Sequence, residues 1–213
     1  MQLRGTGIWS HNMSHILRAR LPEGTAFILR PVQPEDTLAL QALVEGLPYR
    51  DLRWRFHGAV KGVSGERLLR MTQVDPLREA ALVGSLEDQG GSCLIADARF
   101  VIDEDDGDSA EFALMVSEAW RRLGVGALAL VALQHAAAQR GLHWLHGSVC
   151  ADNTPMLALL QHCGFRCHPH RGDRRLVVAE IGLHPPDPPG HPAGTSHPAR
   201  WWQRPFTSPR HHR

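Results

Sequence analysis

The segment EFALMVSEAWRRLGVG, residues 111–126, guides the interpretation of the rest of the chain. Its first six residues, 111–116, consist of Glu111 and a short apolar run at 112–116 of the kind found in buried strands. After it the pattern changes, and a helix is predicted from about Gly124 to Arg140, with Gly141 at its end. The segment therefore predicts a strand that leads through a short connection into a helix.

Two glycines stand where this helix begins. Gly124 and Gly126 carry no Cβ, so the backbone there can come close to a ligand. The first N–H groups of a helix have no partner within it and lie at the positive end of its dipole, which suits a pyrophosphate. Arg121 and Arg122 add positive charge to the same end. The ligand indicated is an anion with two phosphates.

Three interpretations of this glycine-rich turn compete. A phosphate-binding P-loop requires Gly-Lys followed by Ser or Thr, and no such triplet follows. A Rossmann dinucleotide turn would tolerate Ala129 at its third glycine position, but the strands before it are hairpin-linked rather than part of a parallel unit. A tight strand-to-helix turn without a ligand also explains the glycines, and these residues alone leave that alternative open.

Upstream of this segment, helical patterns give way to strand patterns at about Ala80. The change predicts a hairpin with a turn at Gln89–Gly91, followed by an acidic turn at 103–108. The elements expected in this part are a strand at 26–32, a helix opened by Pro34, Glu35 and Asp36 with Leu38, Ala42 and Leu43 on its apolar face, helices at 49–56 and 64–73, and strands at 80–87 and 92–102.

Downstream of the segment the pattern is strand, helix, strand. Residues 142–149 predict a strand, and a helix begins at Asp152 or Asn153 with Pro155 in its first turn. Residues 174–181 close the domain as a strand. Together the elements predict a mixed α/β domain of the α+β kind without an internal repeat.

The two ends of the chain differ from this domain. Residues 1–23 show no clear periodicity and predict a loosely ordered extension. From His184 onward prolines recur among His, Gly and Ser, and such a sequence cannot sustain a helix or a sheet ladder. We therefore expect one folded domain at 24–183 and a disordered tail at 184–213.

The bulk composition is that of an ordinary globular protein, with 43% hydrophobic and 21% charged residues and a net charge of +1. This near-neutral charge creates no field that would attract nucleic acid or an anionic membrane. No apolar run approaches the roughly 20 residues needed to cross a bilayer. Four scattered cysteines and the lack of a signal-peptide pattern predict reduced thiols in a cytoplasmic protein.

The RRLGVG sequence at 121–126 resembles the pyrophosphate motif of GNAT acetyltransferases, in which Arg or Gln is followed by x-x-G-x-G/A. Asn153, followed eleven residues on by Gly164 and Phe165, is similar to a later helix of that family. The resemblance spans roughly 28–181. It implies the GNAT fold, a mostly antiparallel mixed sheet flanked by helices, with acetyl-CoA in a cleft between two splayed strands. The cofactor-binding residues that it implies are Met115, Val116, Arg121, Arg122, Leu123, Gly124, Val125, Gly126 and Asn153.

A narrower resemblance connects the chain with the GNAT domain of bacterial protein lysine acetyltransferases. It rests on LRPVQPED at 29–36, RWRFHG at 53–58, TQVDPLREAALVG at 72–84 and AEFALMV at 110–116. It implies acetyl transfer to a primary amine, a protein lysine, with Glu111 as the general base. Removing the proton of a lysine at pH 7 costs roughly 4–5 kcal/mol, and a carboxylate could accept that proton directly or through one water.

One position departs from the family pattern. Many GNAT enzymes protonate the leaving thiolate with a tyrosine, and Leu160 stands at that position here, while the only tyrosine is Tyr49. Solvent, Cys150, Ser148 or His146 could supply the proton instead. Two alternatives to a protein lysine acetyltransferase remain: an enzyme that acetylates a small amine, and an acetyl-CoA-binding sensor without turnover.

No metal is expected. Cys163, Cys167, His168 and His170 are close enough in sequence for zinc, but they straddle a turn into a strand and have no second ligand pair. The acidic run at 103–108 fails the calcium-loop pattern because Gly107 stands at a ligand position. We interpret this run as a solvated hairpin turn.

Overall fold

The computed structural model describes residues 16–21, 24–56, 63–86, 93–105 and 107–183 of the 213-residue chain. The predicted turn at 89–91 and the predicted tail at 184–213 lie outside these ranges, as do residues 1–15 of the predicted extension. Within the described ranges, no helix is both long enough and apolar enough to cross a membrane.

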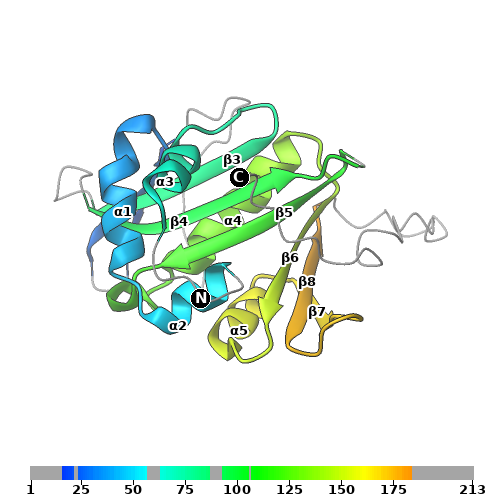
Figure 1. The fold of residues 1–213 in the computed structure, drawn as a ribbon. Coiled ribbons are helices and arrows are strands. Elements are labelled where there is room, and N and C mark those ends of the chain that lie inside the picture. Colours follow the sequence, from blue (N-terminus) through cyan, green and yellow to red (C-terminus); the bar gives the residue numbers. More distant parts are fainter. Residues whose placement is uncertain (1–15, 22–23, 57–62, 87–92, 106, 184–213) are drawn as a thin grey trace.

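The described residues contain eight strands, which form one sheet: β1 (Leu17–Arg20), β2 (Ala26–Pro31), β3 (Glu79–Leu86), β4 (Leu94–Ile102), β5 (Ser109–Val116), β6 (Trp144–Cys150), β7 (Arg166–Pro169) and β8 (Leu176–Gly182). Their order across the sheet is β1-β2-β3-β4-β5-β6-β8-β7 (Figure 1). Every neighbouring pair is antiparallel except β5 and β6, which run parallel. The prediction of a mostly antiparallel mixed sheet is confirmed.

Helices cover both faces of this sheet. They are α1 (Thr37–Glu45), α2 (Tyr49–Phe56), α3 (Gly65–Thr72), α4 (Val125–Gln139) and α5 (Thr154–His162). Helices α1, α2 and α3 lie on one face, and α4 lies on the other (Figure 1). The buried Leu160 of α5 packs into the same core as α4. The mixed α/β architecture expected from the sequence is therefore present.

A hydrophobic core lies on each face of the sheet. Phe100 and Leu130 belong to the core beneath α4, and Leu40 belongs to the core beneath α1 and α3. Strand β5 contributes to both cores, with Phe112 in the first and Met115 in the second. Because β5 is covered on both faces from Phe112 onward, its sequence from Phe112 to Val116 is a continuous apolar run rather than an alternation of apolar and polar residues.

Two edge strands and one helix face differ from the sequence-based expectations. Strand β1 lies within the segment predicted to be a loosely ordered extension. It and β7 have only four residues each, without fully buried positions, so neither produces a clear sequence pattern. In α1, Leu38 is 78% exposed, and the buried stripe consists of Leu40, Leu43 and Val44.

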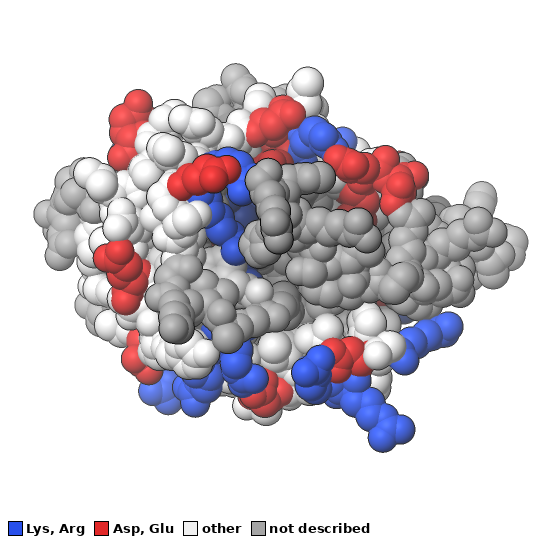
Figure 2. All heavy atoms as spheres, viewed as in Figure 1, with Lys and Arg blue, Asp and Glu red and all other residues white. Residues whose placement is uncertain are grey.

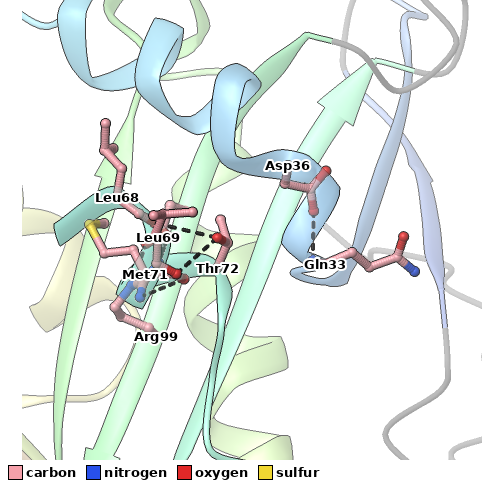
Figure 3. Close-up of polar contacts among 8 residues, drawn as sticks. Gln33, Asp36, Leu68, Leu69, Met71, Thr72 and Arg99 are labelled. Carbon is pink, nitrogen blue, oxygen red and sulfur yellow. Dashed lines mark hydrogen bonds and ion pairs between the residues drawn. The ribbon is translucent and has the colours of Figure 1, made fainter. Parts of the chain in front are cut away.

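A buried ion pair ties α3 to the sheet. Arg99 donates from Nε to Asp97 Oδ1 at 2.9 Å, and both side chains are buried. The Nη1 of Arg99 donates to the carbonyl of Met71 in α3 at 3.1 Å (Figure 3). Arg99 lies opposite Ala113 of β5, so Glu111, two residues earlier, shares this face of the sheet. The pair therefore fixes α3 on the face to which Glu111 belongs.

Acidic and basic side chains are mixed over the face that α1, α2 and α3 cover (Figure 2). Basic side chains gather along the lower edge of this view, over α2 and the β7–β8 hairpin. The mixture agrees with the net charge of +1 of the whole chain. No single sign of charge dominates the described residues on this face.

Candidate active site

Strands β5 and β6 run side by side for only three residues and then part (Figure 1). Beyond these residues β5 continues to Val116 and β6 to Cys150 without further pairing between them. The edge of β5 that faces β6 therefore has no partner among the described strands from Phe112 to Val116. Backbone groups on such an edge can bind an extended ligand. The paired positions are Ser109 with Trp144, Ala110 with Leu145, and Glu111 with His146.

Gly147 lies at the point where the strands part. A Cβ at this position would lie 3.0 Å from the ring of Phe112 and 3.2 Å from its carbonyl oxygen. Any other residue would therefore push β6 away from β5. Glycine here allows Glu111 and His146 to form the last pair directly before the strands diverge.

Glu111 marks the closed end of the split between β5 and β6. Because directly opposite residues of neighbouring strands share a face, Glu111 and His146 project to the same side of the sheet. The Glu111 side chain is open to solvent, but desolvation by the surrounding protein raises its pKa above the ordinary glutamate value. His146 and Arg55 lower this pKa and Asp103 raises it, and the net shift is upward. A carboxyl group with a raised pKa is better matched to accept a proton near neutral pH.

Asp103 connects the β4–β5 turn to this closed end. Its Oδ2 lies 2.7 Å from Nε2 of His146 and accepts a hydrogen bond from Oγ of the buried Ser109 at 2.6 Å. The first residue of the acidic turn therefore holds a side chain of the site. Glu104 and Asp108 of the same turn are exposed, as expected for a solvated turn.

The open end of the split lies where β5 leads into α4. Two residues in this connection have left-handed backbone conformations, Arg122 with φ 60° and Gly124 with φ 90°. For a non-glycine residue this conformation costs roughly 1–2 kcal/mol, so Arg122 is strained. Helix α4 begins directly after Gly124 without a side-chain cap from the described residues. A turn of this kind that ends at an uncapped helix start presents backbone N–H groups to an anion.

Gly126 lies where α4 packs closely against its neighbours. A Cβ on Gly126 would lie 2.9 Å from Cδ2 of Leu159 and within 4 Å of Leu114 and Val116. The Cβ position therefore faces α5 and β5, and a larger residue there would displace the Leu159 side chain. Around Gly124, in contrast, no atom lies within 4 Å of an added Cβ, so that position is open.

The Arg121 side chain is bound within the protein. Its Nε and Nη2 both donate to the carbonyl of Val116 at 3.1 Å, and Nη2 also donates to Asp51 Oδ2 at 2.7 Å. Asp51 is a buried residue of α2. The Arg121 guanidinium thus joins α2 to the end of β5, whereas the Arg122 side chain is exposed.

The start of α5 lies beside α2. Oδ1 of Asn153 accepts a hydrogen bond from the N–H of Met156 at 3.2 Å and caps the helix. The preceding residue, Asp152, accepts a hydrogen bond from Nε1 of Trp54 at 2.8 Å and pairs with Arg53. The Asn153 side chain is therefore used in capping, and its neighbour holds α2 in place.

Leu160, at the position of the family's tyrosine, is fully buried in the core beneath α4. The three polar candidates for protonating a thiolate, His146, Ser148 and Cys150, alternate along β6 and so share one face. His146 is at the closed end of the split. Cys150 is at the far end of β6, where desolvation raises the pKa of its thiol.

A family model for the acetyltransferase (GNAT) domain matches residues 26–166, well over half of the chain. The chain belongs to the GNAT acetyltransferase family. It is therefore an acetyl-CoA-dependent N-acetyltransferase, as the RRLGVG segment predicts. The split sheet with an uncapped helix at its open end is the GNAT cleft expected between two splayed strands.

Solved structures share this GNAT fold. The GNAT domain of S. lividans PAT has 21% sequence identity and a TM-score of 0.72, and the match covers 78% of this chain and 96% of that one. A cAMP-binding acyltransferase from Mycobacterium smegmatis has 23% identity and a TM-score of 0.56 over 81% of this chain and 48% of that one. The yncA protein of Salmonella typhimurium, solved with its cofactor acetyl-CoA, has 19% identity and a TM-score of 0.61 over 76% of this chain and 97% of that one.

The residues at the open end fit the pyrophosphate of acetyl-CoA. Arg122 and Gly124 shape a turn with backbone N–H groups at the start of α4, and the exposed Arg122 side chain adds positive charge. The edge of β5 from Phe112 to Val116, which pairs with no described strand on this side, would offer backbone groups to the pantetheine arm, apart from the Val116 carbonyl that Arg121 occupies. When bound, acetyl-CoA supplies the activated acetyl group as a thioester.

The cysteines and histidines near β7 do not form a metal site in the described ranges, where no group of three or more His, Cys, Asp or Glu residues is arranged to hold an ion. Cys163 and Cys167 are free thiols, and desolvation raises the pKa of each. Nδ1 of His170 accepts hydrogen bonds from the backbone N–H groups of Gly172 and Asp173. That nitrogen therefore stabilises the local turn.

Sequence reasoning misses three polar residues of the site: Asp51, Trp54 and Asp103. Asp51 and Trp54 reach the site through contacts with residues 70 and 98 positions away, for which no local pattern exists. Asp103 directly follows the predicted strand at 92–102 and begins the acidic turn that leads into the strand of Glu111. This position in the sequence is the one sign that Asp103 could lie near Glu111.

Proposed function

We propose that this GNAT enzyme transfers the acetyl group of acetyl-CoA to the side-chain amine of a protein lysine, with Glu111 as the general base. The observation that carries the proposal is the position of Glu111, the last β5 residue paired with β6 before the strands part. The resemblance of residues 29–36, 53–58, 72–84 and 110–116 to bacterial protein lysine acetyltransferases supports the protein acceptor.

The two ends of the split suit the two halves of the reaction. From Glu111 to Val116 the strand spans five residue steps, or roughly 17 Å at about 3.3–3.4 Å per step. We propose that acetyl-CoA lies along this edge, with its pyrophosphate at the start of α4 and its thioester near Glu111. The acceptor amine would then approach from the sheet face that α2 and α3 cover.

Glu111 has a task that matches its environment. A lysine amine has a pKa of about 10.4, and at pH 7 its deprotonation costs roughly 4–5 kcal/mol. As the amine nitrogen attacks the thioester carbonyl, Glu111 accepts its proton directly or through one water. Unpaired N–H groups on the edge of β5 would stabilise the negative charge on the carbonyl oxygen.

The remaining proton returns to the CoA thiolate. Leu160 is buried and has no proton to give, so the acid is solvent or one of the polar residues on β6. A simple thiol has a pKa near 8.5, so water at neutral pH can reprotonate the thiolate without a dedicated acid. We therefore propose that the missing tyrosine does not prevent turnover.

Two measurements test this function. Cell protein incubated with the enzyme and labelled acetyl-CoA should acquire label on lysine side chains, detected by mass spectrometry. The chain contains a single lysine, Lys61, so a Lys61→Arg variant removes lysine self-acetylation from the signal. Label confined to small amines would point instead to a small-molecule N-acetyltransferase.

A sensor is the second candidate, and the buried Leu160 in place of the tyrosine favours it. Calorimetric binding of acetyl-CoA together with the absence of thiol release for proteins, polyamines and amino acids would support the sensor. Thiol release with any of these acceptors would exclude it.

The proposed compartment is the cytoplasm. Cys93, Cys150, Cys163 and Cys167 are all free thiols. Free thiols are typical of a reducing compartment. Fluorescence of a tagged protein in its native host would test this proposal.

A further inference from the structure

Three ionisable residues form a row across the sheet at the closed end of the split. Glu111 on β5 is opposite His146 on β6, and His146 is opposite Glu180 on β8. Directly opposite residues share a face, so all three side chains project to the same side. His146 is 8% exposed and Glu180 is 6% exposed. A buried imidazole thus lies between two carboxylates, one of which is the proposed base.

The orientation of His146 is fixed by Asp103. The two side chains are 2.7 Å apart, and Asp103 is itself held by the hydroxyl of Ser109 and by a backbone hydrogen bond from its own N–H to the Ser109 carbonyl. An ionised carboxylate only accepts hydrogen bonds, so Nε2 of His146 is the donor. In the neutral ring Nδ1 is then the nitrogen that can take up a proton.

We propose that the Asp103–His146 pair is a proton relay for Glu111, and this inference rests on the proposed function. During transfer the N–C bond forms, the C–S bond breaks, and the proton of the amine moves to a Glu111 carboxylate oxygen. That O–H bond then breaks as the proton moves to Nδ1 of His146, directly or through a water. The imidazolium that forms is stabilised by the Asp103 carboxylate, and it returns the proton to solvent.

The charges around Asp103 and His146 favour transfer of the proton from Glu111 to His146. Asp103 faces His146 from the β4–β5 turn, Glu111 from β5 and Glu180 from β8. Three carboxylates therefore surround one imidazole. Arg55 of α2 acts electrostatically on Glu111 and favours the ionised carboxylate, and so favours departure of the proton. Glu180 also lies 3.5 Å from His168.

Residues Asp103 and His146 are positioning residues, because they act through Glu111. The test compares His146→Gln with His143→Gln, a matched control on the segment that leads into β6. His143 is half-exposed and lies 3.9 Å from Asp108, too far for a hydrogen bond. A glutamine at 146 can still donate to Asp103 but cannot take up a proton. Turnover and its pH dependence are measured by thiol release with saturating acetyl-CoA and a lysine peptide.

The relay predicts that His146→Gln lowers kcat about 10-fold at neutral pH and leaves the KM for acetyl-CoA unchanged. Part of the loss should also be recovered at high pH, where more of the acceptor amine is already neutral and less proton has to pass through Glu111. In His146→Ala, added imidazole should restore part of the turnover, which a misfolded variant would not allow. His143→Gln should match the wild type.

Wild-type turnover and pH profile in His146→Gln would overturn the relay, and so would a His146→Ala variant that loses turnover without recovery by imidazole. Glu111→Gln separates this failure from failure of the proposed function. If Glu111→Gln is inactive and His146→Gln is not, only the relay is wrong. If Glu111→Gln keeps wild-type turnover, the assignment of the base is wrong and the relay falls with it.

Discussion

The two ends of the split between β5 and β6 are built in different ways. The open end consists of consecutive residues from Val116 to Gly126, and its backbone conformation is set by Arg122 and Gly124. The closed end combines Glu111 of β5, His146 of β6 and Asp103 of the β4–β5 turn. A site for acetyl-CoA that is built from consecutive residues can be recognised from a sequence motif. A proton-transfer site built from several strands can be recognised only when the residue pairing between those strands is known.

The largest effect is expected from Glu111→Gln, because it removes the base and leaves the open end untouched. General bases contribute about 10²–10⁴-fold, so kcat at neutral pH should fall by that factor. The Kd for acetyl-CoA, measured by calorimetry, should remain within about twofold of the wild-type value, since the proposed pyrophosphate site lies beyond the end of β5, and Val116 at that end is already roughly 17 Å from Glu111 along the strand. A Kd that weakens as much as kcat falls would show that the two ends are not independent.

The next effect separates the two glycines of the open end. Gly126→Ala places a Cβ 2.9 Å from Leu159 and should destabilise the fold by about 1–3 kcal/mol through overpacking. Adding Leu159→Ala should recover part of this loss. Gly124→Ala costs about 1–2 kcal/mol through its positive φ, and Leu159→Ala should not relieve it. Urea unfolding of the four variants measures both, and equal rescue of the two glycine variants would contradict the packing role of Gly126.

Asp51→Asn should have a smaller effect, on the affinity for acetyl-CoA. The substitution weakens the link from Asp51 through Arg121 to the carbonyl of Val116, and the loop before α4 loses one of its fixed points. We expect a rise of about 3- to 10-fold in the Kd for acetyl-CoA, equivalent to the roughly 1 kcal/mol of a typical hydrogen bond. Asp173→Asn, which breaks an exposed pair with Arg175, is the matched control and should leave the Kd unchanged.

The smallest expected effect is on thermal stability, because the ionised Glu111 side chain destabilises the folded protein. The pKa of Glu111 is raised by desolvation, so the unfolded chain releases this proton at a lower pH than the folded protein does. Stability from this group is full below the unfolded value of about 4.3 and is lost as pH rises through the folded pKa. Glutamine cannot ionise, so Glu111→Gln should raise Tm by about one or two degrees at pH 7 and leave it unchanged near pH 4. A lower Tm at pH 7 would indicate that Glu111 stabilises the fold.

The sequence predicts the parts of this molecule whose signals are local. Helix α2 matches the predicted range 49–56, and the Asn153 cap matches the predicted start of α5. Glu111 at the closed end could be named only through resemblance to a family, because an isolated glutamate in an apolar strand has many explanations. Its neighbours Asp103 and His146 are 43 positions apart and meet only after β5 and β6 pair. The packing role of Gly126 depends on Leu159 of another helix and was likewise beyond reach.

The pH dependence of turnover in Glu111→Gln tests most directly whether Glu111 is the base. Wild type and variant are compared by thiol release from pH 7 to pH 10 with saturating acetyl-CoA and a lysine peptide. If Glu111 removes the proton of the amine, the variant should recover much of its loss at high pH, where more of the acceptor is already neutral. A ratio of wild-type to variant turnover that stays constant across this range would contradict the assignment, and so would wild-type turnover in the variant at pH 7.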